Sequence, residues 1–284
     1  MSKKILVTGA TGFIGHYVIE NLLQKEIEVI ASSHHQEKAR LMPWYQKVKY
    51  IPFDIHSDFS LLNLFECFDK PEACIHLSWQ GLPHYKELYH IEKELPVQFQ
   101  FLSNLLEHGL KNLSVTGTCF EYGMQEGELT EDMAVKPNNN YAKAKNELRL
   151  MLESMQQNYS FSFKWLRLFY MYGKGQNPKS LFSQLEHALC RNDEEFNMSG
   201  GEQVRDFLPV EKVAAYIVKA ALQTEVNGVI NVSSNKPITV KQFIENYLLE
   251  KQKNIQLNLG VYPYPDFEPR EFWGNNHKLL SIPG

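Results

Sequence analysis

The sequence has 284 residues, of which 43% are hydrophobic and 22% charged, as in an ordinary soluble globular protein with a sizeable core. The formal net charge of −4 shows no basic excess, so we expect no nucleic-acid partner. No apolar run approaches the roughly 20 residues that cross a bilayer, and "MSKK" leads directly into a short apolar run, so we expect a cytoplasmic protein without a membrane partner.

Short apolar runs bounded by turn residues recur along the first 172 residues, and segments that can be helical separate them. The runs are KKILVTG, EVIAS, VKYIPFD, EACIHLS, LSVTGT and SFKWLRLF. This alternation predicts an α/β fold, a doubly wound parallel (Rossmann) sheet with a smaller C-terminal substrate-binding lobe. We assign residues 1–172 to a dinucleotide-binding domain that carries the catalytic residues. Residues 173–284 are assigned mainly to the lobe, interleaved with the first domain.

The first strand ends in a glycine-rich turn, TGATGFIG, from which a helical pattern continues. Gly9 permits a sharp turn, Gly12 lets the backbone approach a pyrophosphate, and Gly15 permits close helix–strand packing. The free N–H groups of the helix start would face the anion. A lone glycine pattern also fits an unliganded strand–turn–helix, but its place on the first strand of a βαβ series favours dinucleotide binding.

The second strand ends in "ASSHH" without a carboxylate, and two basic residues, Lys38 and Arg40, follow. An Asp or Glu there would bind the ribose hydroxyls and repel a 2′-phosphate, whereas Ser33, His34 and Arg40 tolerate or attract that phosphate. We therefore favour NADP(H) as the cofactor, with NAD(H) as the alternative. A solvated basic helix start would equally explain the two basic residues. Asp54, which ends the third strand, is placed either to meet the adenine edge or to cap a helix.

Tyr141 and Lys145 in "YAKAK" are four residues apart, so they lie on one face of a helix. An ammonium group and an oxidised nicotinamide beside the phenol would lower its pKa from about 10, as acid–base work near neutrality needs. YxxxK alone occurs by chance, but Thr118 at the end of the fifth strand is placed to hold a substrate oxygen beside Tyr141. The three residues predict hydride transfer at a carbonyl or carbinol carbon.

The stretches TGATGFIG, TCFEYG, YAKAK, RLFYMYGKGQ and GGEQVRDFLPVEKVAAYI resemble the extended short-chain dehydrogenase/reductase family of nucleotide-sugar epimerases, dehydratases and reductases. The resemblance implies an NAD(P)-dependent enzyme with a nucleotide-sugar substrate, and by analogy a homodimer formed through the helix that bears Tyr141. It also implies that Arg205 grips the diphosphate, although an ion pair of Arg205 with Glu202 or Asp206 is the plain alternative. The implied cofactor residues are Gly9, Thr11, Gly12, Phe13, Ile14, Gly15, Ser33, His34, Arg40, Asp54, Ile55, Leu77 and Lys145. The implied substrate residues are Trp79, Thr118, Tyr141, Tyr170, Asn177 and Arg205.

Departures from the family pattern narrow the reaction. Cys119 and Phe120 stand where the family's dehydratases carry acidic residues, and Glu121 would point to the other side of an extended segment, so 4,6-dehydration is not expected. Epimerases of this family commonly read NAD with an acidic residue that this chain lacks. We therefore favour a reductase that acts on the 4-keto group of a nucleotide-linked 6-deoxyhexose. A nucleotide-sugar 4-epimerase is the alternative, and a non-catalytic dinucleotide-binding regulator is a weaker one.

Two further positions remain open at this stage. Tyr170 stands where many relatives carry an Asn that contacts the diphosphate, and Trp79 either shapes the sugar pocket or fills core. The four cysteines form no CxxC pair and the histidines show no ligand spacing, so no metal is expected.

Overall fold

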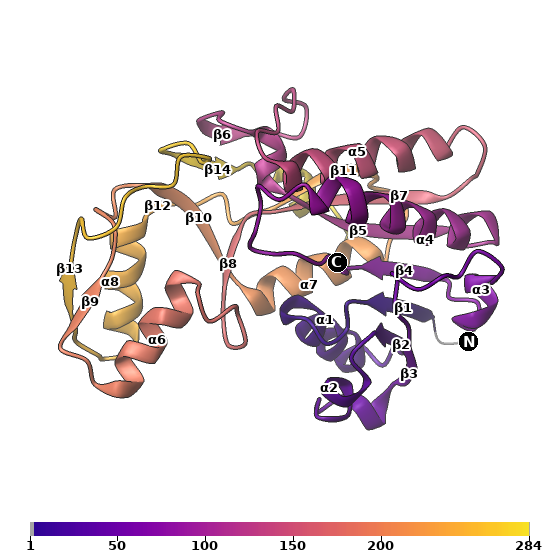
Figure 1. Cartoon of the computed structure of the whole chain (residues 1–284), viewed down its shortest axis with the longest axis horizontal. Coiled ribbons are helices and arrows are strands. Elements are labelled where there is room, and N and C mark those ends of the chain that lie inside the picture. Colours follow the sequence, from indigo (N-terminus) through magenta and orange to yellow (C-terminus); the bar gives the residue numbers. More distant parts are fainter. Residues whose placement is uncertain (1–2, 284) are drawn as a thin grey trace.

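The computed structural model describes residues 3–283, which form a large sheet flanked by helices and a smaller lobe beside it (Figure 1). The sheet has seven strands in the order β11-β7-β5-β4-β1-β2-β3, and every neighbouring pair is parallel. Its strands are β1 (Lys4–Thr8), β2 (Glu28–Ser33), β3 (Lys49–Pro52), β4 (Ala73–His76), β5 (Asn112–Thr118), β7 (Ser162–Leu168) and β11 (Gly228–Val232). The chain therefore has the doubly wound topology predicted from its apolar runs, with the reversal of strand order between β1 and β4.

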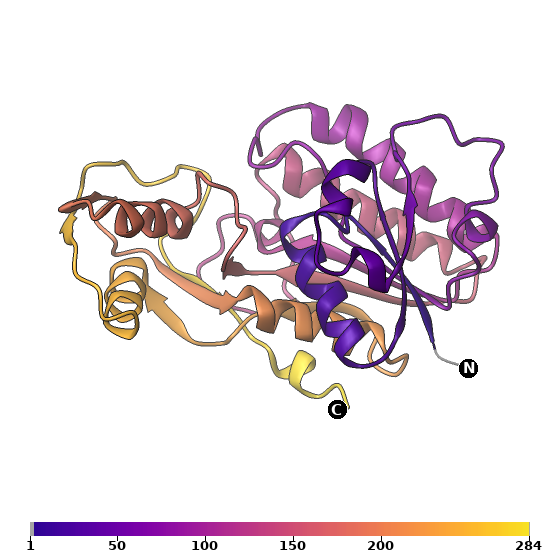
Figure 2. The same cartoon turned by 90° about the horizontal axis from the view of Figure 1, so that it is seen from below.

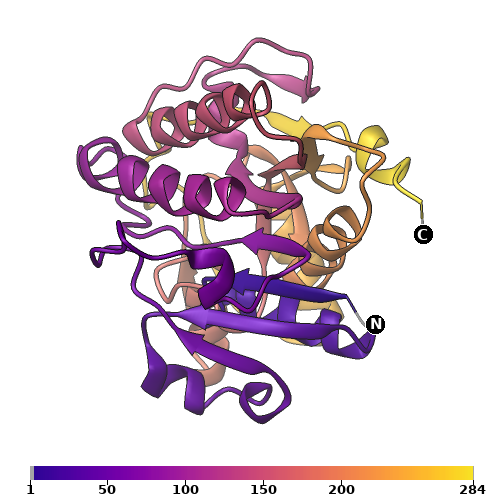
Figure 3. The same cartoon turned by 90° about the vertical axis from the view of Figure 1, so that its right-hand side faces the viewer.

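Helices cover both faces of this sheet, which is why most side chains of its central strands are buried. Helices α1 (Phe13–Gln24) and α7 (Val210–Ala221) pack on one face, and α4 (Leu95–Glu107) and α5 (Asn140–Met155) on the other (Figure 3). The short helices are α2 (Gln36–Arg40), α3 (Leu64–Cys67) and α9 (His277–Leu280). Side chains such as Val18 and Ile217 on the first face, and Leu105 and Leu148 on the second, are fully buried. Burial of each such side chain contributes roughly 1.5–3 kcal/mol.

The lobe lies beside the carboxyl ends of the central strands and has its own core (Figure 2). It contains α6 (Leu181–Arg191), α8 (Val240–Glu250), the pair β9 (Glu195–Asn197) and β13 (Gln256–Asn258), and a sheet of β8 (Tyr170–Tyr172), β10 (Val204–Pro209) and β12 (Pro237–Thr239). A further pair, β6 (Gly127–Leu129) and β14 (Phe272–Gly274), links the two parts. The lobe is interrupted in sequence by α7 and β11, which return to the large sheet.

No helix within residues 3–283 is long and apolar enough to cross a membrane.

Candidate active site

The glycine turn after β1 has the geometry that a bound pyrophosphate requires. Gly9 has φ +66°, and a Cβ there would lie 2.9 Å from the carbonyl carbon of Leu77. A side chain at Gly15 would overlap the carbonyl oxygen of Gly9, so α1 packs against the turn only because this residue is glycine. Helix α1 starts after Gly12 without a side-chain cap and without an acidic residue in its first turn. Its first N–H groups and the positive end of its dipole suit an anion.

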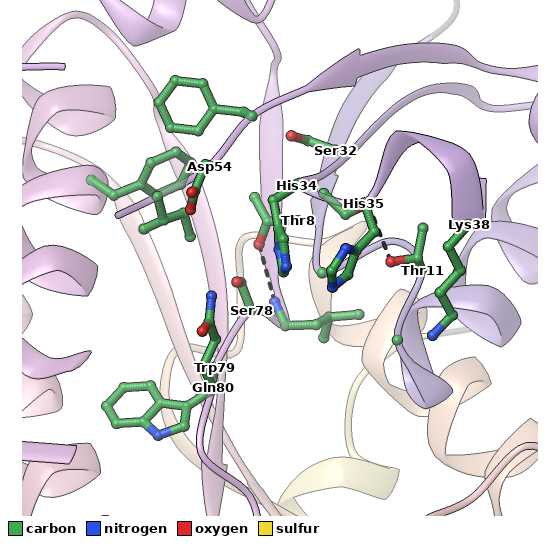
Figure 4. A pocket seen from close by; sticks show the side chains of 17 residues that line it. Thr8, Thr11, Ser32, His34, His35, Lys38, Asp54, Ser78, Trp79 and Gln80 are labelled. Carbon is green, nitrogen blue, oxygen red and sulfur yellow. Dashed lines mark hydrogen bonds between the residues drawn. The ribbon is translucent and has the colours of Figure 1, made fainter. Parts of the chain in front are cut away.

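A cavity of about 210 Å³, here called the cofactor pocket, lies between the ends of β1, β2, β3 and β4 (Figure 4). The predicted residues that line it are Gly9, Thr11, Gly12, Ser33, His34, Asp54, Ile55, Leu77 and Trp79. Hydroxyl groups dominate the β2 end, where Thr11 Oγ1 donates to Ser33 Oγ at 3.2 Å and Ser33 Oγ lies 3.0 Å from the Tyr50 hydroxyl. The pocket thus brings residues from four separate strand ends to one site.

Two predictions at this end of the pocket need correction. Arg40 does not line the cavity: its side chain is exposed and pairs with Glu37 at 3.1 Å. Lys38, on the same short helix, lines the pocket instead because the helical turn directs it to that side. Asp54 lines the pocket, but its alternative role as a helix cap is wrong, since its Oδ1 accepts from the N–H of His56 at 3.0 Å in a turn and no helix begins there.

A buried chain of polar side chains fixes the ends of β1 and β4 beneath the pocket. Burial lowers the pKa of His76 to about 3, so the ring is neutral. Its Nδ1 lies 2.9 Å from Thr8 Oγ1, and its Nε2 lies 2.7 Å from Gln98 Oε1. Gln98 donates in turn to Glu94 at 2.9 Å, and Glu94 accepts from the backbone N–H of Gln80 at 3.0 Å. The loop that lines the pocket after β4 is thereby held to the sheet.

Helix α5 positions Tyr141 and Lys145 in one buried row. The helix begins at a polar cap, where Asn139 accepts from the N–H of Ala142 at 2.9 Å. The Lys145 ammonium donates to the carbonyl oxygen of Thr116 at 2.8 Å and lies 4.1 Å from the centre of the Trp79 ring. The Trp79 ring also packs edge-on against Tyr141. Trp79 therefore lies between the cofactor pocket and the catalytic pair.

Burial shifts the pKa values of Tyr141 and Lys145 in opposite directions. Burial raises the pKa of Tyr141, and Tyr85 and Glu121 raise it further, while Thr118 opposes them only in part. The protein groups alone therefore raise this pKa, and its lowering by a bound oxidised nicotinamide stays a prediction. Burial lowers the pKa of Lys145 to about 7, against the opposing effect of Glu121 and Glu94. At neutral pH the phenol is protonated, and the ammonium is close to its titration point.

Thr118 ends β5 and begins a 3-10 turn, Cys119–Tyr122. Its N–H donates to Glu121 at 2.9 Å, and Glu121 also forms a buried ion pair with Arg167 at 2.7 Å. Trp165 Nε1 donates to the same carboxylate at 2.9 Å. The carboxylate of Glu121 thus points into the core, which confirms the expected direction. Fully partnered and buried, it stabilises the turn and is not directed at substrate.

A second cavity has a volume of about 330 Å³ and is named the catalytic pocket below. Two of the three residues predicted to be catalytic, Thr118 and Tyr141, line it. Of the predicted residues, Phe13, Ile14, Thr118, Tyr141, Tyr170 and Asn177 line it. Leu82, Pro83, Tyr85, Cys119 and Phe120 complete much of its wall. None of the described residues that line this pocket is Asp, Glu, Lys, Arg or His. The pocket is uncharged and largely apolar around the two hydroxyl groups of Thr118 and Tyr141.

Arg205 lies in a third cavity of about 560 Å³, here called the lobe groove. The guanidinium is almost fully buried and donates to Glu268 at 2.9 Å. The alternative partners predicted for it are wrong. Glu202 lies near Arg270, at 3.6 Å, and Asp206 accepts from the backbone N–H groups of residues 234 and 235.

The lobe groove adjoins the catalytic pocket. Four residues line both cavities, namely Tyr85, Tyr170, Met171 and Gln176. An elongated molecule can therefore lie with one end beside Tyr141 and the other in the lobe. Tyr85 is held at this boundary because its carbonyl oxygen accepts from the N–H of Tyr141 at 3.0 Å.

Sequence reasoning did not assign Tyr85, Glu268 or Lys38 to the site. Lys38 is basic and follows β2, so the sequence indicated it as a candidate, but the prediction named Arg40. Tyr85 and Glu268 belong to segments without helix or strand, far apart in sequence, so no local pattern indicated that they meet.

Comparisons with known proteins agree with this geometry. The chain matches the family model described as "NAD dependent epimerase/dehydratase family" over residues 5–233. It is 28% identical to dTDP-6-deoxy-L-talose 4-dehydrogenase (NAD(+)) of Aggregatibacter actinomycetemcomitans, over 95% of this chain and 98% of that protein. It is 25% identical to GDP-6-deoxy-D-talose 4-dehydrogenase of the same organism, over 99% of this chain and 91% of that protein. The fold matches the solved structure of MoeE5 in complex with UDP-glucuronic acid and NAD, with a TM-score of 0.81 and 22% identity over 98% of this chain and 92% of that one.

Proposed function

The chain belongs to the NAD dependent epimerase/dehydratase family, and on this premise we propose that it reduces the 4-keto group of a nucleotide-linked 6-deoxyhexose. Membership makes it an enzyme of nucleotide-sugar chemistry that uses NAD(H). The observation that carries the finer proposal is the uncharged catalytic pocket, in which two hydroxyl groups, of Thr118 and Tyr141, face a largely apolar wall.

The absence of charge from the described lining of this pocket selects among sugars. A uronate carboxylate would be buried there without a cation, which costs several kcal/mol. The apolar side chains of Leu82 and Phe120 suit the methyl group of a 6-deoxy sugar. Elimination of water needs a second acid or base at the sugar, and within the described residues the nearest carboxylate on this turn, Glu121, points into the core. These features support reduction over dehydration.

The residues take distinct roles in this proposal. When bound, the nicotinamide dinucleotide supplies the hydride for carbon 4. Tyr141 donates its hydroxyl proton to the 4-oxygen, and its raised pKa keeps that proton in place at neutral pH. The Thr118 hydroxyl positions the same oxygen. Lys145, whose pKa is about 7, exchanges a proton at the pH at which Tyr141 must be reprotonated.

The test is a panel of dTDP-, GDP-, UDP- and CDP-linked 4-keto-6-deoxyhexoses with NADH and NADPH. We expect nicotinamide oxidation with at least one of these 4-keto sugars. UDP-glucuronic acid, which has a hydroxyl group at carbon 4, is incubated separately with NAD+ and NADP+, and there we expect neither nicotinamide reduction nor epimerisation. Oxidation or epimerisation of the uronate at a comparable kcat/KM would contradict the proposal, since no lining side chain that the structure describes could pair its carboxylate.

We also propose that the cofactor pocket accepts NADP(H) as well as NAD(H). Ser33, His35 and Lys38 line the pocket at the end of β2, where the adenosine ribose of a dinucleotide lies in this fold. Of the described residues that line the pocket, Asp54 alone is acidic, and it follows β3, one strand further out. A 2′-phosphate would therefore meet hydroxyl groups and an ammonium.

We propose a homodimer through α4 and α5. A shallow apolar hollow on these helices is lined by Phe99, Leu150 and Met151, and Leu150 is 43% exposed. A hollow of this size does not by itself mark an interface, so the proposal rests on the family resemblance, and Leu150 offers a position at which to test it. Sedimentation analysis should give a dimer for the native chain and a monomer for Leu150→Lys; a native monomer would contradict this point.

A further inference from the structure

The lobe groove is lined by a carboxylate of the protein, that of Glu268, at the place where a diphosphate would have to bind. If the catalytic pocket holds the sugar and the lobe groove the nucleoside, the diphosphate must lie at their boundary, beside Tyr85 and Tyr170. Arg205 lines the groove at this boundary, and its ring neighbours are Tyr170 at 5.5 Å and Phe272 at 4.6 Å. Its Nη2 already donates to a carboxylate, that of Glu268, at 2.9 Å.

Glu268 belongs to a segment that side-chain contacts hold against the rest of the site. Residues 262–268, here called the strap, form no helix or strand. Asp266 pairs with Lys86 at 3.0 Å, although both side chains are largely exposed. Phe267 packs against Tyr85, with ring centres 5.8 Å apart, and its carbonyl oxygen accepts a hydrogen bond at 3.1 Å. An exposed ion pair contributes about 0–1 kcal/mol, so the strap is held chiefly by the Phe267 contacts and by Glu268, which accepts from Arg205 and from the Tyr170 hydroxyl.

The remaining guanidinium contacts fix Arg205 independently of Glu268. Its Nη1 donates to the carbonyl oxygens of Val204 at 2.8 Å and Arg270 at 3.0 Å. The aromatic rings on its flanks restrain it further. Arg205 can therefore exchange one anion for another without leaving its position. A diphosphate and the Glu268 carboxylate would repel each other if both stayed at the same guanidinium.

We propose that Glu268 is a stand-in for the substrate's diphosphate, and that a nucleoside diphosphate displaces it from Arg205 when it binds. The inference rests on the proposed function, because it takes the ligand of the groove to be a nucleotide sugar. Glu268 keeps the buried guanidinium neutralised in the free enzyme, and the strap moves with Glu268 when the ligand arrives. Apparent affinity is then lowered by the fraction of molecules in which Glu268 occupies Arg205. A ligand without the diphosphate gains nothing from displacing it.

The experiment compares the native chain with Glu268→Gln by calorimetric titration of dTDP, UDP and GDP, and of thymidine as the ligand without phosphate. Glu268→Gln should bind the preferred nucleoside diphosphate about fivefold more tightly or better, because the competing charge is gone. Affinity for thymidine should not change. The matched control is Glu245→Gln, which removes one charge from an exposed pair with Lys241 on α8 and should leave all affinities unchanged.

Equal or weaker binding of the diphosphate by Glu268→Gln would overturn the inference, since Glu268 would then support Arg205 and not compete for it. If that variant does not fold, crystals of the native chain with dTDP decide the matter. Separation of Glu268 from Arg205 Nη2 supports the inference, and persistence of the 2.9 Å contact with the diphosphate elsewhere overturns it. Failure of every form of the chain to bind any nucleoside diphosphate would refute the proposed function as well, so the two failures are distinguishable.

Discussion

The two ends of the substrate site each bury a cation, but they treat its charge differently. At the catalytic end, the Lys145 ammonium contacts a carbonyl oxygen and the Trp79 ring, and no carboxylate within residues 3–283 forms an ion pair with it. At the lobe end, Arg205 is paired with Glu268 at 2.9 Å. Burial lowers the pKa of Lys145 to about 7. Burial also acts to lower the pKa of Arg205, but Tyr170 and Glu268 outweigh it and raise the pKa overall.

The contrast separates a group suited to proton transfer from a group suited to binding. A cation that is buried without a counter-charge lies near its titration point, so it exchanges protons at neutral pH. A guanidinium stays charged at neutral pH with or without a carboxylate partner, so it is suited to binding and not to proton exchange. The four predictions below test this contrast, beginning with the largest effect.

Tyr141→Phe removes the proposed proton donor and keeps nearly the same side-chain shape in the pocket. We expect turnover to fall by roughly a thousandfold, the scale of a lost general acid, while NADH affinity changes little. Steady-state rates and cofactor titration measure the two effects. Near-native turnover in this variant would show that the catalytic end does not depend on this phenol.

Arg205→Met removes the cation from the lobe end and leaves Glu268 buried without its partner. The free energy of unfolding should fall by roughly 3 kcal/mol at pH 7, because an uncompensated buried charge costs more than the lost pair contributed. Urea denaturation measures the change. The double variant Arg205→Met with Glu268→Leu should regain most of the loss; a single variant as stable as the native chain would mean that this pair carries no buried charge.

Lys145→Met should increase the free energy of unfolding at pH 7, whereas Arg205→Met should decrease it. Because the folded-state pKa of about 7 lies below the ordinary 10.5, folding penalises the charged form. That penalty is full below pH 7 and disappears as the pH rises toward 10.5, so the native chain should gain stability between pH 7 and 9.5. We expect the variant to be more stable at pH 7 by on the order of 2 kcal/mol, with a smaller difference at pH 9.5. A less stable variant at pH 7 would contradict the unpaired state of this ammonium.

Lys38→Ala tests the smallest effect, at the cofactor pocket. Loss of one ammonium from a 2′-phosphate site should weaken NADPH binding about tenfold and leave NADH binding nearly unchanged. Arg40→Ala is the matched control, because its side chain is exposed and pairs with Glu37, so it should change neither affinity. Fluorescence titration measures both. An effect of Arg40→Ala larger than that of Lys38→Ala would show that Arg40, and not Lys38, contacts the 2′-phosphate.

The parts of the molecule that the sequence predicted are those in which local chemistry decides the structure. The apolar runs and the Gly9–Gly12–Gly15 spacing correctly indicated the parallel sheet and the turn at its first strand, because each rests on backbone geometry within a few residues. Glu121 does point away from the catalytic pocket as predicted, but the predicted reason is wrong, because residues 119–122 form a 3-10 turn and not an extended segment.

The misses concern relations that only the folded chain creates. The raised pKa of Tyr141 comes from burial, which cannot be read from the four-residue spacing to Lys145. The pairing of Arg205 with Glu268 joins residues 63 positions apart, and Glu268 itself lies in a segment without helix or strand. The sequence did not show which basic residue of α2 faces the cofactor pocket. The helix has only five residues, so its orientation cannot be read from an apolar pattern, and it is Lys38 and not Arg40 that lines the pocket.

The most direct test of the account follows the fate of a deuterium carried by the reducing nicotinamide. The chain is incubated with deuterated NADH or NADPH and the accepted 4-keto-6-deoxyhexose nucleotide, and the product is analysed by mass spectrometry and NMR. The account predicts one deuterium at carbon 4 for each nicotinamide oxidised. No nicotinamide consumed with any 4-keto sugar, together with inversion at carbon 4 of a nucleotide-linked 4-hydroxy hexose incubated with NAD+, would contradict it and establish an epimerase instead.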